Sequence, residues 1–246
     1  MTKREQNFQN YSEETLTKSF ATISQRFAAM AADAGVTVRA FNGPHPTWFA
    51  KLPLEQKINV LRSFATYVDV AQEVVLNRES LVSDHRFLWR MLLRLDLIPT
   101  ADFFSHLEGD EDIIEIYSVP DFVQIYRNIS FFHNCSYTLE EILCRPYWEL
   151  YQRDQSITDA IMLTAEAVTR QKKLSTVHYD LPPHRLVEID SVHNFSSIVE
   201  NKFISPLVNS NREIVAVVNV MSGALEGKTD LQLLNLDISA PEVEFE

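Results

Sequence analysis

Two long stretches in the N-terminal half carry apolar residues at every third or fourth position. The repeating positions are Leu16, Phe20, Ile23, Phe27 and Met30 in the first stretch, and Leu54, Ile58, Leu61, Phe64, Val68, Ala71 and Val75 in the second. One apolar stripe at this period predicts an amphipathic α-helix in each stretch. Ser12, followed by two acids, is suited to cap the first helix, and Gly35 is suited to end it.

A loop that contains Pro44 and Pro46 separates these two stretches, and weaker helical signals follow the second one. Asp84 is suited to cap a third helix that ends before Pro99, and a short fourth helix is predicted from Thr100 to near Gly109. We therefore expect residues 11–110 to form helix hairpins or a small bundle. The apolar stripes either pack into a core or form a dimer face.

The pattern changes after Asp112. Short β-rich runs occur at 113–117 and 122–127, helical signals at 129–154 and 157–170, and further strand-like runs at 176–179, 186–189, 195–204 and 214–221. The order is two strands, several helices, then three or more strands. The chain is thus predicted to be α+β, with a helical N-terminal half followed by a sheet domain.

The last predicted strand is apolar on both faces. Ile214, Ala216, Val218 and Val220 alternate with Val215, Val217 and Met221, and Asn219 interrupts the second set. A strand of this kind is covered on both sides. The helices of the same domain supply one cover, and either the N-terminal helices or a second subunit supplies the other.

The stretch 128–150 resembles the helical segment of Per-Arnt-Sim (PAS) sensory domains. Asn128 fits the asparagine after the family's second strand, Tyr137–Ile142 fits its Tyr-Ser/Thr-x-Glu-Glu-Leu step, and Tyr147–Leu150 fits its aromatic segment. The stretch 203–218 is similar to the family's final hairpin, so the resemblance covers about residues 113–222. Ser136 and Cys144 stand where the family has glycines, and the connection 179–193 is longer than usual. Thr138 and Glu141 also have the spacing of a capping box.

The resemblance implies a five-stranded antiparallel sheet covered by helices, and a non-catalytic signalling or sensory role. The interior would bind a small apolar ligand or be a filled core, lined by Phe131, Phe132, Tyr137, Ile142, Trp148, Ile161 and Val187. A protein partner is expected, and a homodimer would form through the two-sided sheet and the first helix. No cofactor is specified. His133 and His178 are the candidates for a haem ligand, and Asn134-Cys135 shares only two residues with the flavin-binding motif of the family's light sensors.

An enzyme is the alternative interpretation. An isomerase or hydratase on an α+β scaffold would use Tyr179, Asp180 and His184 as its acid–base set. The sequence has no glycine-rich phosphate loop and no Gly-x-Ser-x-Gly elbow. His178, His184 and His193 could converge on a metal, although two prolines between the first pair prevent counting sheet faces. Cys135 and Cys144 are expected to be reduced, and a redox switch would need an exposed thiol of low pKa.

The net charge of −12 and the pI of about 5.0 disfavour nucleic acid and anionic membranes as partners. No apolar run has the length of a membrane span, and the N-terminus lacks a signal-peptide core, so a cytoplasmic location is expected. Residues 1–10 are predicted to be a disordered tail and 111–222 the PAS-like domain. Residues 223–246 carry six acids and one lysine, which indicates a solvated tail or a partner-binding segment.

Overall fold

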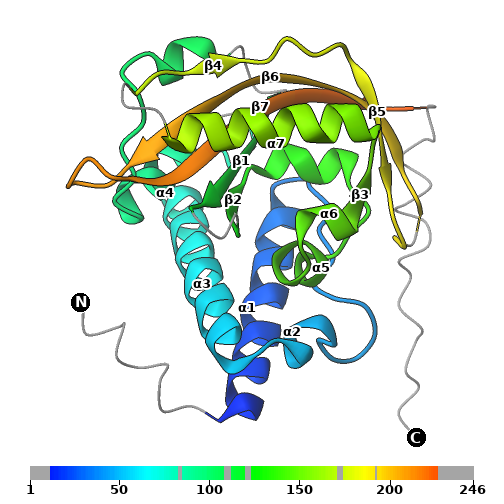
Figure 1. Ribbon diagram of the computed structural model, residues 1–246. Helices are drawn as coiled ribbons and strands as arrows, with labels where there is room; N and C mark the ends of the chain where they lie inside the picture. The colour runs from blue at the N-terminus through cyan, green and yellow to red at the C-terminus, as the bar shows by residue number, and fades with distance from the viewer. Residues whose placement is uncertain are drawn as a thin grey trace, which may run out of the picture.

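The computed structural model of the chain describes residues 12–82, 85–107, 112–119, 123–170, 174–191 and 193–226 (Figure 1). The side chains of Tyr147 and Trp148 are also outside the described part. The predicted N-terminal tail and most of the predicted acidic tail therefore lie outside the described residues. No helix in the described ranges is both long enough and apolar enough to cross a membrane.

The N-terminal helices lie where helices were predicted, except for the short α2, which was not predicted. They are α1 (Glu13–Asp33), α2 (Trp48–Lys51), α3 (Leu54–Leu76), α4 (Arg86–Arg94) and the 3₁₀ helix η2 (Phe103–His106). The Ser12 hydroxyl accepts a hydrogen bond from the Thr15 N–H at 3.3 Å, which confirms the predicted cap. Gly35 has a positive φ of 80°, a conformation that favours glycine after a helix. The cap predicted at Asp84 lies outside the described residues.

The sheet is antiparallel throughout. Its strands are β1 (Ile113–Ser118), β2 (Gln124–Arg127), β3 (Tyr151–Gln152), β4 (Val177–His178), β5 (His184–Glu188), β6 (Ser196–Val208) and β7 (Ile214–Leu225). The order is β2-β1-β7-β6-β5-β3, with β4 paired to β6. The five longer strands make up the expected sheet. Two further strands, β3 and β4, are added to it and contain two residues each. β7 continues to Leu225, beyond the predicted domain end at 222, because Leu225 still pairs with Ser197.

Four helical segments connect β2 to the later strands. They are η3 (Ile129–Asn134), α5 (Leu139–Cys144), α6 (Tyr147–Leu150) and α7 (Gln155–Arg170). The capping box of α5 is confirmed, since the Glu141 N–H donates to the Thr138 hydroxyl at 3.2 Å and the Thr138 N–H donates to the Glu141 carboxylate at 2.8 Å. Asn128 fixes the preceding turn, because its side chain accepts from the Ile114 N–H and donates to the Asp112 carbonyl.

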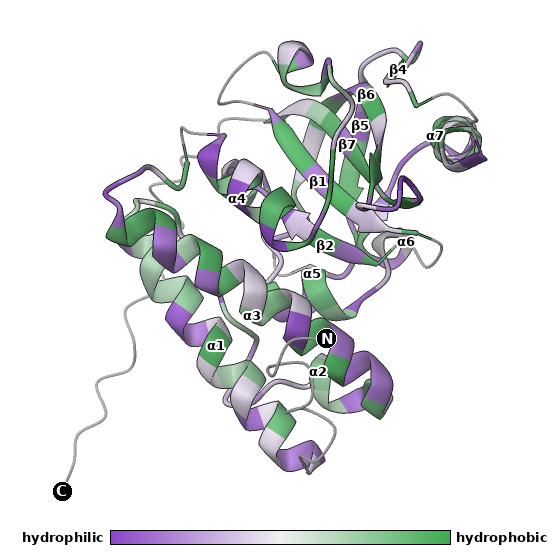
Figure 2. Cartoon of the chain, turned by 90° about the vertical axis from the view of Figure 1, so that its left-hand side faces the viewer, coloured by the Kyte–Doolittle hydropathy of each residue, from purple (hydrophilic) through white to green (hydrophobic). Residues whose placement is uncertain are grey.

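Helices cover both faces of the sheet. The N-terminal helices lie on one side and α7 lies alone on the other (Figure 2). Tyr67 of α3 and Phe87 of α4 pack against Tyr126 of β2, with ring centroids 5.8 and 5.5 Å away. On the opposite face, Val168 of α7 and Val217 of β7 belong to a second apolar cluster.

The N-terminal helices cover the sheet face that was predicted to form a dimer interface, so that predicted interface is wrong. The sheet face and the α1 stripe assigned to a second subunit are buried within the chain itself, because one continuous apolar core extends from Leu16 to Met221. The two-sided apolar pattern of β7 thus predicted a second cover correctly, and the chain supplies it.

Candidate functional site

The two faces of β1 carry different chemistry because successive residues of a strand point to opposite sides. Ile114 and Ile116 face the N-terminal helices and join the main core. Glu115 and Tyr117 point to the other face, where they line a cavity beneath α7. The α7 face is therefore polar near its centre, which is unusual for a covered sheet face.

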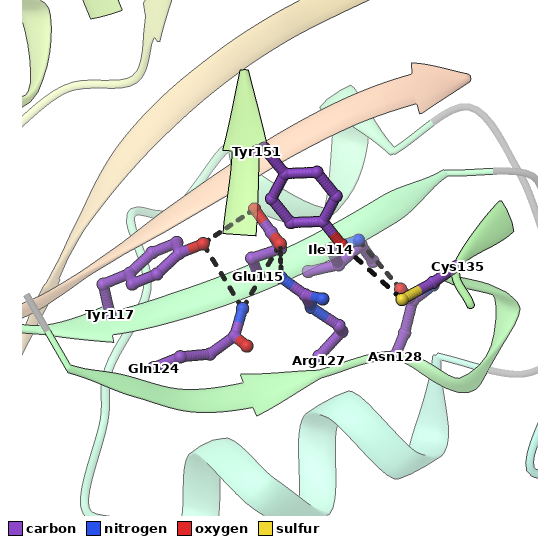
Figure 3. Close-up of polar contacts among 8 residues, drawn as sticks. All are labelled: Ile114, Glu115, Tyr117, Gln124, Arg127, Asn128, Cys135 and Tyr151. Carbon is purple, nitrogen blue, oxygen red and sulfur yellow. Dashed lines mark hydrogen bonds and ion pairs between the residues drawn. The ribbon is translucent and has the colours of Figure 1, made fainter. Parts of the chain in front are cut away.

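A buried ion pair occupies this polar centre (Figure 3). Arg127 of β2 donates from Nη2 to Glu115, and the two side chains are 4% and 2% exposed. The Tyr117 hydroxyl donates to the other Glu115 oxygen at 3.0 Å, and the Gln124 amide donates to the carboxylate at 3.2 Å. Three donors from two strands thus hold one carboxylate in place.

Packing holds Arg127 as firmly as hydrogen bonds do. Its guanidinium lies 3.6 Å from the ring centre of Phe131. Its carbonyl accepts a 2.6 Å hydrogen bond from the Tyr67 hydroxyl of α3, which ties β2 to the N-terminal helices. Desolvation is the largest single influence on the pKa of Arg127 and lowers it, but Glu115 together with Tyr151, Tyr117 and Cys135 raises it more, so the net pKa is raised and the arginine stays charged.

A chamber of about 90 Å³ lies between α7 and the sheet. Its lining includes Glu115, Tyr117, Arg153, Ile161, Tyr179, Asn201 and Asn219. Asn201 and Asn219 are 3% and 8% exposed. Both polar atoms of the Asn201 amide, the Asn219 Oδ1 and the Tyr179 hydroxyl lack a hydrogen-bond partner within the described chain. Because buried polar atoms are almost always paired, these four atoms point to a functional role for the chamber.

Arg153 and His184 stand beside this chamber. Burial lowers the pKa of Arg153. The His184 Nδ1 lies 3.1 Å from the Pro182 carbonyl, and its Nε2 lies 3.4 Å from Arg153 Nη1. Burial also lowers the pKa of His184. A neutral imidazole that donates from Nδ1 and accepts at Nε2 fits both contacts.

The seven residues predicted to line the interior are spread over several sites. Ile161 lines the chamber, while Phe132 and Ile142 face α3 and β2 in a smaller apolar pocket. Phe131 supports Arg127, and the Tyr137 hydroxyl bonds to the backbone of Leu150 and Ile189. Val187 does not line the chamber, because it alternates with Leu186 and Glu188, which take the inner face of β5. The side chain of Trp148 lies outside the described residues.

The predicted acid–base set does not come together. Tyr179 lines the chamber, His184 is buried against Pro182, and Asp180 is exposed at the surface. An exposed carboxylate away from the Tyr179 hydroxyl cannot complete the expected set.

The histidine and cysteine hypotheses gain no support. His178 packs on His106 and Phe203, whereas His193 stacks on Phe195. No three metal-binding side chains cluster in the described ranges. Burial raises the pKa of Cys135 to about 12 and raises that of Cys144 well above its usual value. Protonated thiols disfavour the redox switch.

The polar residues of the site were missed by sequence reasoning. Glu115 and Arg127 lie on the short β-rich runs at 113–117 and 122–127, which were predicted as strands without a role for either residue. The interruption of β7 at Asn219 was the one available signal, because a polar residue on a covered face requires a partner. Nothing in the sequence linked it to Asn201, which lies eighteen positions earlier on β6.

No family model matches the sequence, and no curated protein matches it. Similar solved structures include a light-oxygen-voltage domain studied with a flavin analogue, at 19% identity and a TM-score of 0.33, covering 51% of this chain and 87% of the other.

Two further structures cover similar parts. The light-state structure of the blue-light photoreceptor Aureochrome1 is 21% identical with a TM-score of 0.31, covering 51% of this chain and 94% of that one. A sensory box histidine kinase from Vibrio cholerae is 14% identical with a TM-score of 0.32, covering 56% and 93%. The strand order β2-β1-β7-β6-β5, with its helices inserted between β2 and β5, is what identifies residues 113–225 as a PAS-like fold.

Proposed function

We propose that this chain is a non-catalytic sensory protein whose PAS-like domain binds a small polar molecule between α7 and the sheet. The observation that carries the proposal is the set of unpaired polar atoms on Asn201, Asn219 and Tyr179, which line one chamber. These polar atoms change the expected ligand from a purely apolar molecule to one that also carries a group able to donate and accept hydrogen bonds, while Ile161, Ile204 and Val217 contact its apolar part.

The energetics favour occupation of the chamber. Each buried polar atom without a partner costs about 1–3 kcal/mol. A ligand that pairs with the Asn201 amide and the Asn219 oxygen recovers this cost on binding. A volume of about 90 Å³ suits several water molecules or one organic molecule of a few heavy atoms.

The position of α7 offers a route for the signal. Among its described side chains only Ala165 and Val168 are buried, whereas Met162 and Leu163 are exposed. A helix anchored by so little apolar surface shifts readily when the chamber beneath it fills. The ligand would thereby change the surface that α7 presents to a partner.

The test is native mass spectrometry of the purified chain, combined with thermal melts against small amides, alcohols and amino acids. We expect a retained small molecule, or a ligand that raises the melting temperature of the wild type but not of Asn219→Ala. Asn211→Ala, in the exposed β6–β7 turn, is the matched control and should respond like the wild type. A wild-type chain that retains nothing and responds to no compound would refute the proposal.

A second copy of the chain is the protein partner best supported by the surface. Trp89 and Phe104 are exposed and in ring contact at 5.4 Å, and Leu93 stands one helical turn from Trp89 on α4. An exposed aromatic cluster of this kind is typical of an interface. Light scattering should show a dimer that Trp89→Ser weakens, and a wild-type monomer at all concentrations would exclude this surface as a dimer contact.

A further inference from the structure

A second and larger cavity lies between the start of α3 and the edge of the PAS-like sheet. Its volume is about 590 Å³, which is within the range of small-molecule sites. One wall is the N-terminal part of α3, and the other is formed by β2 and the turn between α5 and α6. The lining comprises Leu52, Glu55, Gln56, Asn59, Val60, Tyr117, Val123, Gln124, Arg127, Ile142, Leu143, Cys144, Arg145, Pro146 and Leu150.

Arg127 lies at the inner wall of this cleft. Its Nη2 is engaged by Glu115, but its Nε and Nη1 have no hydrogen-bond partner in the part of the chain described. The residue is only 4% exposed, and the Phe131 ring beneath the guanidinium fixes its plane. Glu115 offsets the charge of Arg127, and the two unused donors remain to hydrogen-bond an anion.

Arg145 reaches the same cleft from the α5–α6 turn. Its Nη2 donates to the Glu149 carbonyl at 2.7 Å, whereas its buried Nε is unpaired among the described residues. The guanidinium lies 4.8 Å from the Trp48 ring centre and 5.9 Å from that of Tyr137. Two aromatic rings from different parts of the chain therefore orient this second cation.

The remaining lining groups complement an anion with an apolar body. Gln56, Asn59 and Gln124 contribute neutral amides, and Ile142 and Leu150 contribute apolar surface. Among the described lining residues, Glu55 is the acid, and it is exposed on α3. The described cationic groups thus lie on the sheet and turn side, while Glu55 belongs to the opposite wall.

We propose that the cleft binds a small organic anion, whose carboxylate or phosphate group accepts hydrogen bonds from Arg127 and Arg145. This site adjoins the chamber beneath α7, because Tyr117 lines both cavities and the Glu115–Arg127 pair joins them. Glu115 lines the chamber and Arg127 lines the cleft, so an anion that draws on Arg127 alters the field at the chamber. The two ligands would therefore affect each other's affinity.

Calorimetry on the full chain tests the proposal, with benzoate, succinate and inorganic phosphate as probes and succinamide as the uncharged control. Binding of at least one anion, weakened by added sodium chloride, is expected. Arg145→Gln should weaken that binding roughly tenfold to a hundredfold, since hydrogen bonds to charged groups are of this strength. Arg145→Lys keeps the positive charge but loses the Nε donor. Its affinity for the anion should therefore lie between those of the wild type and Arg145→Gln. Tighter binding of succinate or of phosphate shows whether the cleft prefers a carboxylate or a phosphate group.

Two control variants test whether anion binding depends on this cleft. Arg26→Gln removes an equal charge from an exposed pair on α1 and should bind like the wild type. Asn219→Ala, which alters the chamber beneath α7, should retain anion binding even where the chamber ligand is lost. Failure of every anion to bind at concentrations on the order of 10 mM overturns the proposal. Equal binding of succinamide, or unchanged binding by a folded Arg145→Gln chain, also overturns it.

Discussion

At the scale of single residues, the Glu115–Arg127 pair is the most consequential feature of the molecule. Removing two charges from water is costly, and their attraction offsets that cost only when hydrogen bonds complete the site. Tyr117 and Gln124 supply those bonds to Glu115, while Phe131 supports Arg127. Loss of either charge leaves the other buried without its counterion.

Glu115→Gln should therefore destabilise the chain by about 3–5 kcal/mol, because it leaves the Arg127 charge uncompensated. Urea denaturation monitored by circular dichroism measures the change. Glu14→Gln, which removes one acid from a fully exposed, solvent-screened pair on α1, should leave the stability nearly unchanged. The double variant Glu115→Leu with Arg127→Met should recover much of the loss, and equal losses in single and double variants would contradict this account.

His184 should give the stability a pH dependence. Burial lowers its pKa below the unfolded value of about 6.5, so the unfolded chain takes up the proton first. The contribution is complete above pH 6.5 and is lost as the pH falls below it. His184→Asn should thus lose less stability than the wild type between pH 7 and pH 5 in urea titrations. A slope that is the same in His184→Asn and in the wild type would refute the assignment.

At the scale of elements, local sequence sets α5 while tertiary contacts set α7. The capping box places two reciprocal hydrogen bonds at the start of a six-residue helix. Such a short helix depends on its cap, because few internal hydrogen bonds hold it. In contrast, α7 is sixteen residues long and is held by a narrow apolar strip.

Thr138→Ala should cost about 1–2 kcal/mol, since it removes the side-chain cap of α5, leaves the Glu141 N–H without its partner and takes one of two donors from the Glu141 carboxylate. Thermal or urea unfolding provides the measurement. Thr66→Ala, on the exposed part of α3, offers the same change without a cap and should alter stability by less than about 0.5 kcal/mol. A similar effect in the two variants would show that the capping box has no special role.

Hydrogen exchange should be faster in α7 than in β6 and β7. The strands lie between two helical layers, whereas α7 can separate from the sheet at the cost of few buried contacts. Mass spectrometry of peptic fragments distinguishes the segments, and a chamber ligand should slow exchange in α7. Protection of α7 equal to that of the central strands would argue against its proposed motion.

At the scale of the whole molecule, one core joins the two halves of the chain. Residues of α1, α3 and α4 belong to the same apolar cluster as β1 and β7, and the Tyr67 hydroxyl bonds directly to β2. The sheet face beneath α7 is polar near its centre. Removal of the N-terminal helices would expose the other face of the sheet, which is apolar, to water. Neither half therefore has a complete core of its own.

A fragment of residues 111–226 should accordingly fail to fold as a stable monomer, while a fragment of residues 12–226 should retain the cooperative unfolding of the full chain. Circular dichroism, dye binding and light scattering report on both fragments. A shorter fragment that melts cooperatively at a similar temperature would show that the PAS-like part is an independent domain.

Periodicity by itself determined the elements whose information is local. The stripe from Leu54 to Leu76, the cap at Ser12 and the Thr138–Glu141 spacing each depend on residues within a few positions, so α1, α3 and α5 followed from the chain alone. The two-sided apolar pattern of β7 likewise required covers on both faces, without saying what they are. Val187 was misplaced because it shares the less buried face of β5 with Arg185, whereas His184, Leu186 and Glu188 take the inner face.

Only the tertiary structure decided where polar groups meet. Glu115 finds Arg127 through the pairing of β1 with β2, and Asn201 comes near Asn219 because β6 and β7 form a long hairpin with a bulge between Asn201 and Phe203. A bulge shifts register and so changes which side chains share a face. Hydrophobic periods fix which face of an element is buried, but the neighbours on that face come from strand order, register and helix docking, which are properties of the whole chain.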